Sequence, residues 1–290
     1  MMRVRRAYDG ALALALAVSV LLFIVPQFFF VRQSFFESLG MGMMGDELTL
    51  ANYRTILTDS FYIAVFLRTI AISAVAALVA LIIAYPTAYW LSRMNSPALR
   101  WLIILLLVSS FVSIVVKVLG LTMLLGSQGP FVAFLQFVTF GLWNGSLLHN
   151  ELAVAIGLVQ YSLPLLIMLL FGVVQTIPKS LEEAASVHGA SDWRLVRRIL
   201  LPLSLNGIVT AGLIAFNMNM GAFTSAVLLG GGNVLTVPVV IQQKIILEVD
   251  YPVASALSVL LTVAVMAINL VVVAVRRGGF AGARQRRKIA

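Results

Sequence analysis

Apolar positions along this chain come in long runs rather than in short alternating segments. A bilayer core of about 30 Å takes roughly 20 helical residues to cross, and charge-free runs of that order recur along the chain. Irregular backbone facing lipid would leave its polar groups unpaired, so each run predicts a helix. The pattern therefore predicts an all-α polytopic membrane protein with six transmembrane helices. We place these helices at 11–32, 63–91, 100–126, 151–176, 203–229 and 252–275.

Two of the runs differ from a simple transmembrane helix, one by its length and one by its position after a basic N-terminus. The run at 199–243 is too long for one crossing, and the Gly230-Gly231-Gly232-Asn233 cluster predicts the end of its helix. The first run follows MMRVRR, like a signal peptide, but its apolar part of about 21 residues exceeds the usual length of about 7–15. We interpret it as a retained helix. The stretch at 129–143 is too short to span and predicts a short helix at the outer interface.

Composition agrees with this class of protein. The chain is 61% hydrophobic and 11% charged, whereas soluble domains carry about 25% charged residues. Its mean hydropathy is +1.04. Cysteine is absent, which excludes disulfides, thiolate metal sites and thiol nucleophiles.

The net charge of +9 could suggest a nucleic-acid partner, but its placement favours another interpretation. Lysines and arginines concentrate before residue 11, at 93–100, at 179–198 and after residue 275, segments that six spans place on one side. The positive-inside rule then predicts that both termini are cytoplasmic. We expect contact of the basic tail with membrane lipid and no nucleic-acid partner.

The densest cluster of charge reads SLEEAASVHGASDWRLVRRILLP at 180–202. Ser180 and Glu183 have the spacing of a capping box, which predicts a short helix at 181–188, and Gly189 can end it in the left-handed conformation. Apolar positions from Trp193 onward predict a second helix along the membrane surface, before Pro202 begins the next span. A capped surface helix pair is the simplest interpretation. The small pair at 184–185 instead favours close approach of a partner.

The same segment carries a known motif. Glu183-Ala184-Ala185, three residues, Gly189, nine residues, Ile199, one residue and Leu201-Pro202 reproduce EAA-x3-G-x9-I-x-LP. In this the chain resembles the membrane subunits of binding-protein-dependent ABC importers of the type I, MetI-like fold. The resemblance implies that 179–202 is a coupling loop that docks on a cytoplasmic ATPase. The coupling residues it implies are Glu182, Glu183, Ala184, Ala185, Gly189 and Asp192.

Segments at 48–93, 129–178 and 221–232 further resemble the first permease of spermidine/putrescine importers. A polyamine is the solute that this implies, with aminoethylphosphonate, ferric ion and an opine or amino-acid derivative as alternatives. The implied partners are an ATPase dimer holding ATP and Mg²⁺, a second, non-identical permease and a periplasmic binding protein, in the bacterial inner membrane.

The domain organisation that we predict has three parts. An N-terminal helix and periplasmic loop occupy 1–62, a permease core of five helices occupies 63–277, and a basic cytoplasmic tail occupies 278–290.

Other activities have less support in the sequence. No G-x-x-x-x-G-K-[ST] loop occurs, so ATP hydrolysis is expected on a partner and no cofactor or metal on this chain. The acidic residues stand in loops or at span ends, which disfavours ion coupling. His149 and His188 fall on opposite predicted sides, which excludes an H-E-x-x-H zinc site. A self-contained channel or membrane enzyme stays a less favoured alternative.

Two groups of polar residues inside the spans are candidates for a solute path. Pro164 cannot donate to the carbonyl of Gln160, which frees an acceptor there. Further on, polar and small residues recur at helical spacing on one face of the span at 203–229. Packing between helices explains such residues equally well. The candidate path residues are Gln160, Tyr161, Asn217, Gly221, Phe223, Thr224 and Ser225.

Two cations also stand within predicted spans. Arg68 and Lys117 are expected in the outer half of their helices, where their side chains can reach the interface. If they instead lined the path, they would repel a polycation.

Overall fold

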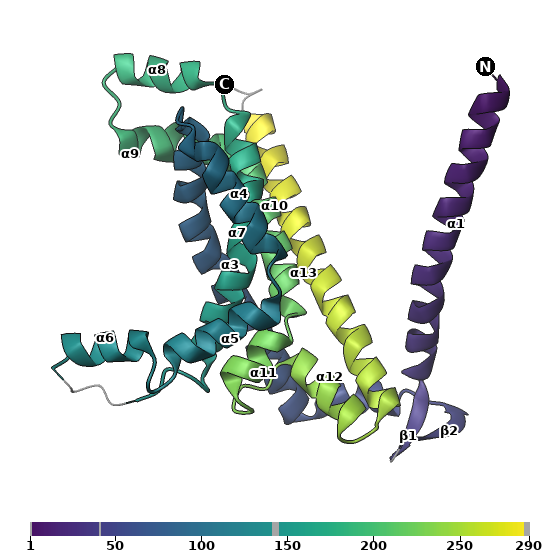
Figure 1. The fold of residues 1–290 in the computed structure, drawn as a ribbon. Helices are drawn as coiled ribbons and strands as arrows, with labels where there is room; N and C mark the ends of the chain where they lie inside the picture. Colours follow the sequence, from purple (N-terminus) through teal and green to yellow (C-terminus); the bar gives the residue numbers. More distant parts are fainter. Residues whose placement is uncertain (1, 41, 141–144, 287–290) are drawn as a thin grey trace. The chain divides into compact units, whose positions relative to one another are not determined.

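The computed structural model describes residues 2–40, 42–140 and 145–286, and most of them are helical (Figure 1). The contacts between residues divide the chain into two compact units. The first unit comprises Met1–Ala64 and Val240–Ala290, and the second comprises Val65–Val239.

The first unit contains two long helices, a short helix and a β-hairpin. Its elements are α1 (Met2–Gln33), β1 (Phe36–Gly40), β2 (Met43–Leu48), α2 (Ala51–Thr58) and α13 (Tyr251–Arg286). The apolar part of α1, Leu16–Gln33, is long enough to cross a bilayer and none of it is buried in protein. Such a surface is stable only where lipid or another protein surrounds it.

The hairpin is an element that the all-α prediction omits. β1 and β2 pair antiparallel, and the Asn52 side chain donates to the carbonyls of Ser34 and Phe36 at 3.1 and 2.8 Å. These bonds satisfy two carbonyls just before and at the start of the hairpin. No Asn-Gly or Asp-Gly pair stands between alternating hydrophobic residues here, so the sequence lacks the usual hairpin signal.

The second unit holds the remaining helices, except that α3 begins in the first unit and most of α12 belongs to the first unit. They are α3 (Ser60–Arg93), α4 (Ala98–Phe111), α5 (Ile114–Leu125), α6 (Pro130–Val138), α7 (Glu151–Gln175), α8 (Lys179–Val187), α9 (Asp192–Leu195), a π-helical turn η1 (Val196–Leu200), α10 (Leu201–Met220), α11 (Thr224–Gly230) and α12 (Val237–Ile246). The buried core of this unit draws on α3, α5, α7 and α11.

Small residues let these helices approach closely. A Cβ added at Gly157 of α7 would lie 2.4 Å from a methyl carbon of Leu229 in α11, and one at Gly207 of α10 would lie 2.5 Å from Val173 in α7. Without a hydrophobic drive between helices in lipid, association depends on this kind of close packing. The glycines therefore set the positions of α10 and α11 against α7.

Among the described residues, six stretches are long and apolar enough to cross a membrane, which confirms the predicted number. They are Leu16–Gln33, Ser60–Arg93, Ile114–Val138, Glu151–Gln175, Trp193–Met220 and Tyr251–Arg276. The second, fourth and sixth agree with the predicted helices at 63–91, 151–176 and 252–275.

The predicted third helix at 100–126 is wrong as one continuous element. Val112 and Ser113 have extended backbone, with ψ of 132° at both, so α4 ends at Phe111 and α5 begins at Ile114. The hydroxyl of Ser110 already donates to the carbonyl of Leu106 at 2.9 Å, and serines compete in this way with regular helical bonding. The break carries no Gly or Pro, so the pattern gave no sign of it.

The predicted fifth helix at 203–229 also differs. It ends at Met220, and α11 begins only at Thr224 after Gly221-Ala222-Phe223. The predicted stop at the glycine cluster is confirmed for α11, because Gly231 takes φ +54° as its C-cap. The predicted short helix at 129–143 is present as α6, while residues 141–144 lie outside the described part of the chain.

Candidate coupling segment and solute path

The segment with the EAA motif folds as a helix, a turn and a second helix. α8 begins after Pro178, and Gly189 takes φ +72° beyond its end. The N–H of Gly189 donates to the carbonyl of Ser186 at 2.9 Å, and that of Ala190 to the carbonyl of Ala185 at 3.0 Å. These two bonds form a Schellman motif, which confirms that Gly189 ends the helix in the left-handed conformation.

The capping box predicted for Ser180 and Glu183 is wrong. The N-cap of α8 is Pro178, which has extended backbone and makes no side-chain capping bond. The helix runs over Lys179–Val187 rather than 181–188, so Ser180 already lies in its first turn. The proline ring holds φ at about −65°, a value that suits the entry into a helix, and α8 begins directly after Pro178.

The two adjacent glutamates lie in different surroundings. The Glu182 side chain is 16% exposed and pairs with Arg93 at the end of α3, where Arg93 Nε donates to Glu182 Oε1 at 2.7 Å. The Tyr89 hydroxyl donates to the other carboxylate oxygen at 3.2 Å. Glu183 is exposed. The helix therefore turns one carboxylate toward α3 and leaves the next one accessible.

The predicted surface helix before Pro202 is not separate from the fifth span. α9, η1 and α10 follow one another without a break, and the apolar stretch begins at Trp193. The N–H of Leu201 bonds to the carbonyl of Val196, five residues back. Because Pro202 has no N–H and its ring crowds the carbonyl four residues earlier, a π-helical turn in front of it keeps the helix continuous.

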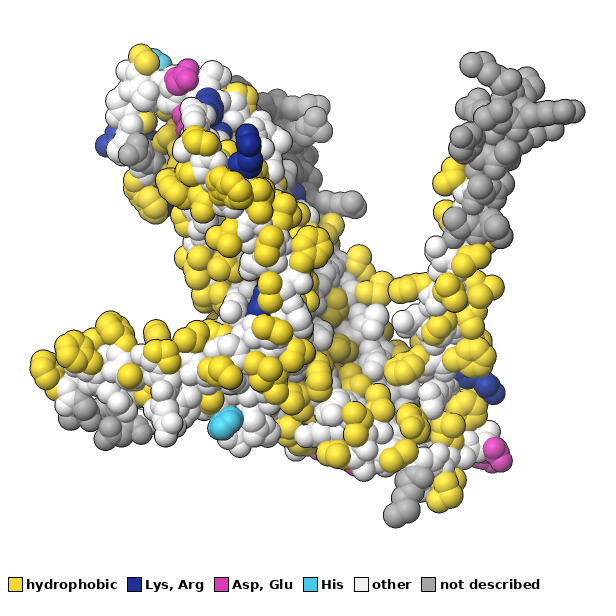
Figure 2. Space-filling view, viewed as in Figure 1, with side chains coloured by type: hydrophobic (Ala, Val, Ile, Leu, Met, Phe, Trp, Pro, Cys, Tyr) yellow, Lys and Arg dark blue, Asp and Glu magenta, His cyan; other side chains and the backbone are white. Residues whose placement is uncertain are grey.

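The outer surface of this segment is accessible and of mixed chemistry. Glu183 and Ala184 are exposed, Ala185 is half-buried, and Val187 and Trp193 are 84% and 70% exposed. Figure 2 shows charged side chains gathered over the α8–α9 end of the second unit. The side chain of Asp192, the last predicted coupling residue, lies outside the described residues.

The candidate path residues of α7 and α10 are partly accessible. Gln160, Tyr161 and Asn217 are half-buried. The bend expected at Pro164 lies within a continuous helix, because α7 runs through this proline to Gln175.

The candidate residues at 221–225 do not continue the face of Asn217, because the helix is interrupted between Met220 and Thr224. Gly221 is exposed, Phe223 and Thr224 are half-buried, and Ser225 is fully buried. The hydroxyl of Ser225 has no hydrogen-bond partner and lies against Gly157.

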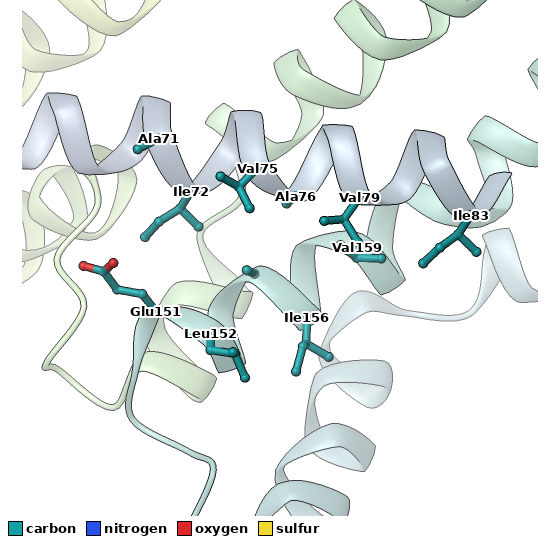
Figure 3. Close-up of a pocket in the computed structure, with 11 residues that line it drawn as sticks. Ala71, Ile72, Val75, Ala76, Val79, Ile83, Glu151, Leu152, Ile156 and Val159 are labelled. Atoms are coloured by element: carbon teal, nitrogen blue, oxygen red, sulfur yellow. The ribbon is translucent and has the colours of Figure 1, made fainter. Parts of the chain in front are cut away.

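An apolar groove of about 600 Å³ lies between α3 and α7. Its walls include Ile72, Val75 and Val79 of α3 and Leu152 and Ile156 of α7, which Figure 3 labels. Glu151 is the one charged side chain among the lining residues described. Glu151 forms an ion pair with Arg68, at 3.0 Å between Oε1 and Nε. The charge of Arg68 is therefore paired beside this groove.

Comparison with known proteins identifies the family. The family model described as "binding-protein-dependent transport system inner membrane component" matches residues 60–278. The chain belongs to this family. The inner-membrane component is therefore a multi-pass membrane protein with the MetI-like fold, as the EAA motif predicted.

Individual relatives agree over nearly the whole chain. The spermidine/putrescine transport system permease protein PotB of Haemophilus influenzae is 31% identical, covering 87% of this chain and 88% of its own. PotB of Escherichia coli is 30% identical over 87% and 91% of the two chains. A solved bacterial ABC transporter involved in the import of the acidic polysaccharide alginate has a TM-score of 0.78 at 17% identity, covering 94% and 96%, which supports the fold.

Sequence reasoning missed the contribution of α3 to the contacts of the candidate coupling segment. Arg93 counted only as one of the cations near the membrane surface, and Tyr89 did not enter the prediction. A signal was available, because Tyr89 and Arg93 stand one helical turn apart at the end of a long apolar run. Their partner could not be identified, since it lies 89 residues further along the chain.

Proposed function

We propose that this inner-membrane component is the permease subunit of an ATP-driven importer, and that its solute is a polyamine such as spermidine or putrescine. The observation that carries the proposal is the likeness to two PotB permeases over most of the chain, at 30–31% identity over 87% of its residues. The fold supports the same class of protein, because the alginate importer covers 94% of the chain.

The energy source in this proposal is a partner ATPase dimer, which holds ATP and Mg²⁺. The exposed side of α8 offers it a carboxylate at Glu183, a small side chain at Ala184 and an apolar one at Val187. Small residues allow a partner backbone to approach closely, and apolar side chains at the centre of an interface supply affinity. The left-handed turn at Gly189 then passes displacement of α8 into the continuous helix α9–η1–α10.

The remaining partners in this proposal are a second, non-identical permease and a periplasmic binding protein. The binding protein would select the solute. The groove between α3 and α7 supports this division, since its walls are apolar and its carboxylate, Glu151, is already paired with Arg68. A polyamine would find little there to bind its several ammonium groups, which favour carboxylates and aromatic faces.

Reconstitution tests both levels of the proposal. The tagged chain is co-expressed with its co-purifying partners, placed in proteoliposomes and supplied with binding protein and internal ATP. Uptake of labelled spermidine or putrescine that requires ATP, Mg²⁺ and binding protein is the expected result. ATP-driven uptake of aminoethylphosphonate or ferric ion alone would overturn the polyamine but keep the importer. A chain that purifies alone and transports without ATP would overturn both.

A further inference from the structure

The contact between α8 and α3 is more elaborate than a surface ion pair. Both oxygens of the Glu182 carboxylate have partners, Arg93 on Oε1 and the Tyr89 hydroxyl on Oε2. The two side chains of the ion pair are 17% and 16% exposed. Charge-assisted bonds of this kind are stronger and more directional than neutral ones.

Arg93 also reaches a third element. Its terminal nitrogen donates to the carbonyl of Ile177, just beyond α7, at 3.3 Å, and its guanidinium lies over the Tyr89 ring at 5.7 Å. One side chain thus joins the end of α3, the end of α7 and the first turn of α8. Its geometry is held by three partners, Glu182, the Ile177 carbonyl and the Tyr89 ring, so a displacement of α8 cannot leave Arg93 unaffected.

The neighbouring residues do not duplicate this link. Lys179 donates to Asn95 at 3.4 Å, a long bond between exposed groups that contributes little. Along residues 71–83 of α3 and 151–159 of α7 the two helices line the apolar groove, whose walls offer no polar link between them beyond Glu151. Among the described residues, the strong polar contacts between α8 and α3 therefore converge on Glu182, which Arg93 and Tyr89 both bind.

Building on the proposed function, we propose that Arg93 and Glu182 form a positioning pair that transmits displacement of α8 to α3. The ATPase then acts on the spans by two routes. One is covalent, through the turn at Gly189 into α10, and the other runs through Glu182, Arg93 and α3. Glu183 is left to contact the partner, and Glu182 holds the coupling helix to its own chain.

The test uses the assembled importer in proteoliposomes with Glu182→Gln and Arg93→Gln. The number of solutes transported per ATP hydrolysed should fall about tenfold, within the range of coupling between residues of one ion-pair network. The amount of ATPase retained on the purified complex should stay unchanged. The charge-reversed double variant, Arg93→Glu with Glu182→Arg, should recover part of the ratio. The control is Arg100→Gln, which removes an exposed charge in the first turn of α4 without touching Glu182.

A second measurement on the purified chain separates the link from the importer. Hydrogen exchange of the amides in α8 should speed up in Glu182→Gln and stay unchanged in Arg100→Gln, because local opening follows loss of the contacts that hold an element. Unchanged exchange in Glu182→Gln would overturn the pair itself. Faster exchange with a normal transport ratio would overturn its transmitting role. Absence of any ATP-driven uptake in the wild-type complex would overturn the proposed function and that role, while exchange still reports on the pair.

Discussion

The two polar segments of the second unit, 179–202 and 217–225, satisfy their polar groups in opposite ways. In the first, the charged side chains that the structure describes are exposed or paired, and Glu182 has a partner on each oxygen. In the second, the helix ends at Met220, and the hydroxyl of Ser225 is buried with no hydrogen-bond partner. Charge next to a membrane has few stable placements, whereas small polar residues within an apolar helix fit several roles.

The largest effect is expected from a bulky side chain at Gly157, where α7 packs against Ser225 of α11. In Gly157→Leu, the first added carbon would lie 2.4 Å from Leu229 and 3.3 Å from the Cβ of Ser225. Overpacking of this kind costs about 1–3 kcal/mol, so the thermal unfolding temperature in detergent should fall clearly. Gly172→Leu in the same helix is the control, because nothing lies within 4 Å of its added carbon. Equal unfolding temperatures for the two variants would mean that α11 does not pack on α7 as described.

A second test compares one glycine from each segment. Gly189 has φ +72° and Gly221 has φ −92°, and neither would place an added Cβ within 4 Å of another atom. Gly189→Ala should therefore lose about 1–2 kcal/mol through the left-handed backbone alone. The stability of Gly221→Ala should stay unchanged. The measurement is again thermal unfolding, and a similar loss in both variants would show that backbone conformation is not the cause.

These differences show which parts of the molecule could be predicted from sequence. The six apolar runs predicted the spans, because bilayer thickness and helix rise fix the length of a span. The EAA spacing predicted the family, and Gly189 within it predicted the turn. The breaks at Val112–Ser113 and after Met220 were missed. The break at Val112–Ser113 carries no Gly or Pro, and a single glycine such as Gly221 is common within transmembrane helices, so neither break stood out in the sequence.

The candidate site divides along the same line. Glu183, Ala184 and Gly189 could be found because a local motif carries them. Glu182 was grouped with them by position, but its pairing with Arg93 depends on how α3 and α8 meet, across 89 residues of sequence. For Asn217 and Ser225 the sequence showed only a helical spacing, and that spacing presumed a helix that the structure interrupts.

A smaller effect on stability is expected from two buried serines, Ser225 and Ser204, and it should differ between their alanine variants. Ser225→Ala removes a hydroxyl that has no partner, whereas Ser204→Ala removes one that donates to the carbonyl of Leu200 at 2.7 Å and lies 3.0 Å from the Tyr85 hydroxyl. Stability should rise or stay level in the first and fall by about 1 kcal/mol in the second. Transport by Ser225→Ala should stay at the wild-type rate. A selective loss of transport there would instead support Ser225 as part of the solute path.

The smallest change in stability is expected at the surface of the candidate coupling segment, where the effect on assembly should be large. Trp193 is 70% exposed, so Trp193→Ala should alter stability by no more than about 0.5 kcal/mol. Exposed tryptophans often carry much of the binding energy of an interface, and retention of the ATPase on the purified complex should drop by roughly tenfold. Trp101→Ala is the matched control, because Trp101 is 71% exposed on α4. If both variants retain the ATPase equally, then the exposed side of 179–202 is not the docking surface of the ATPase. The segments 179–202 and 217–225 would then differ only in that the first is solvated and the second is packed.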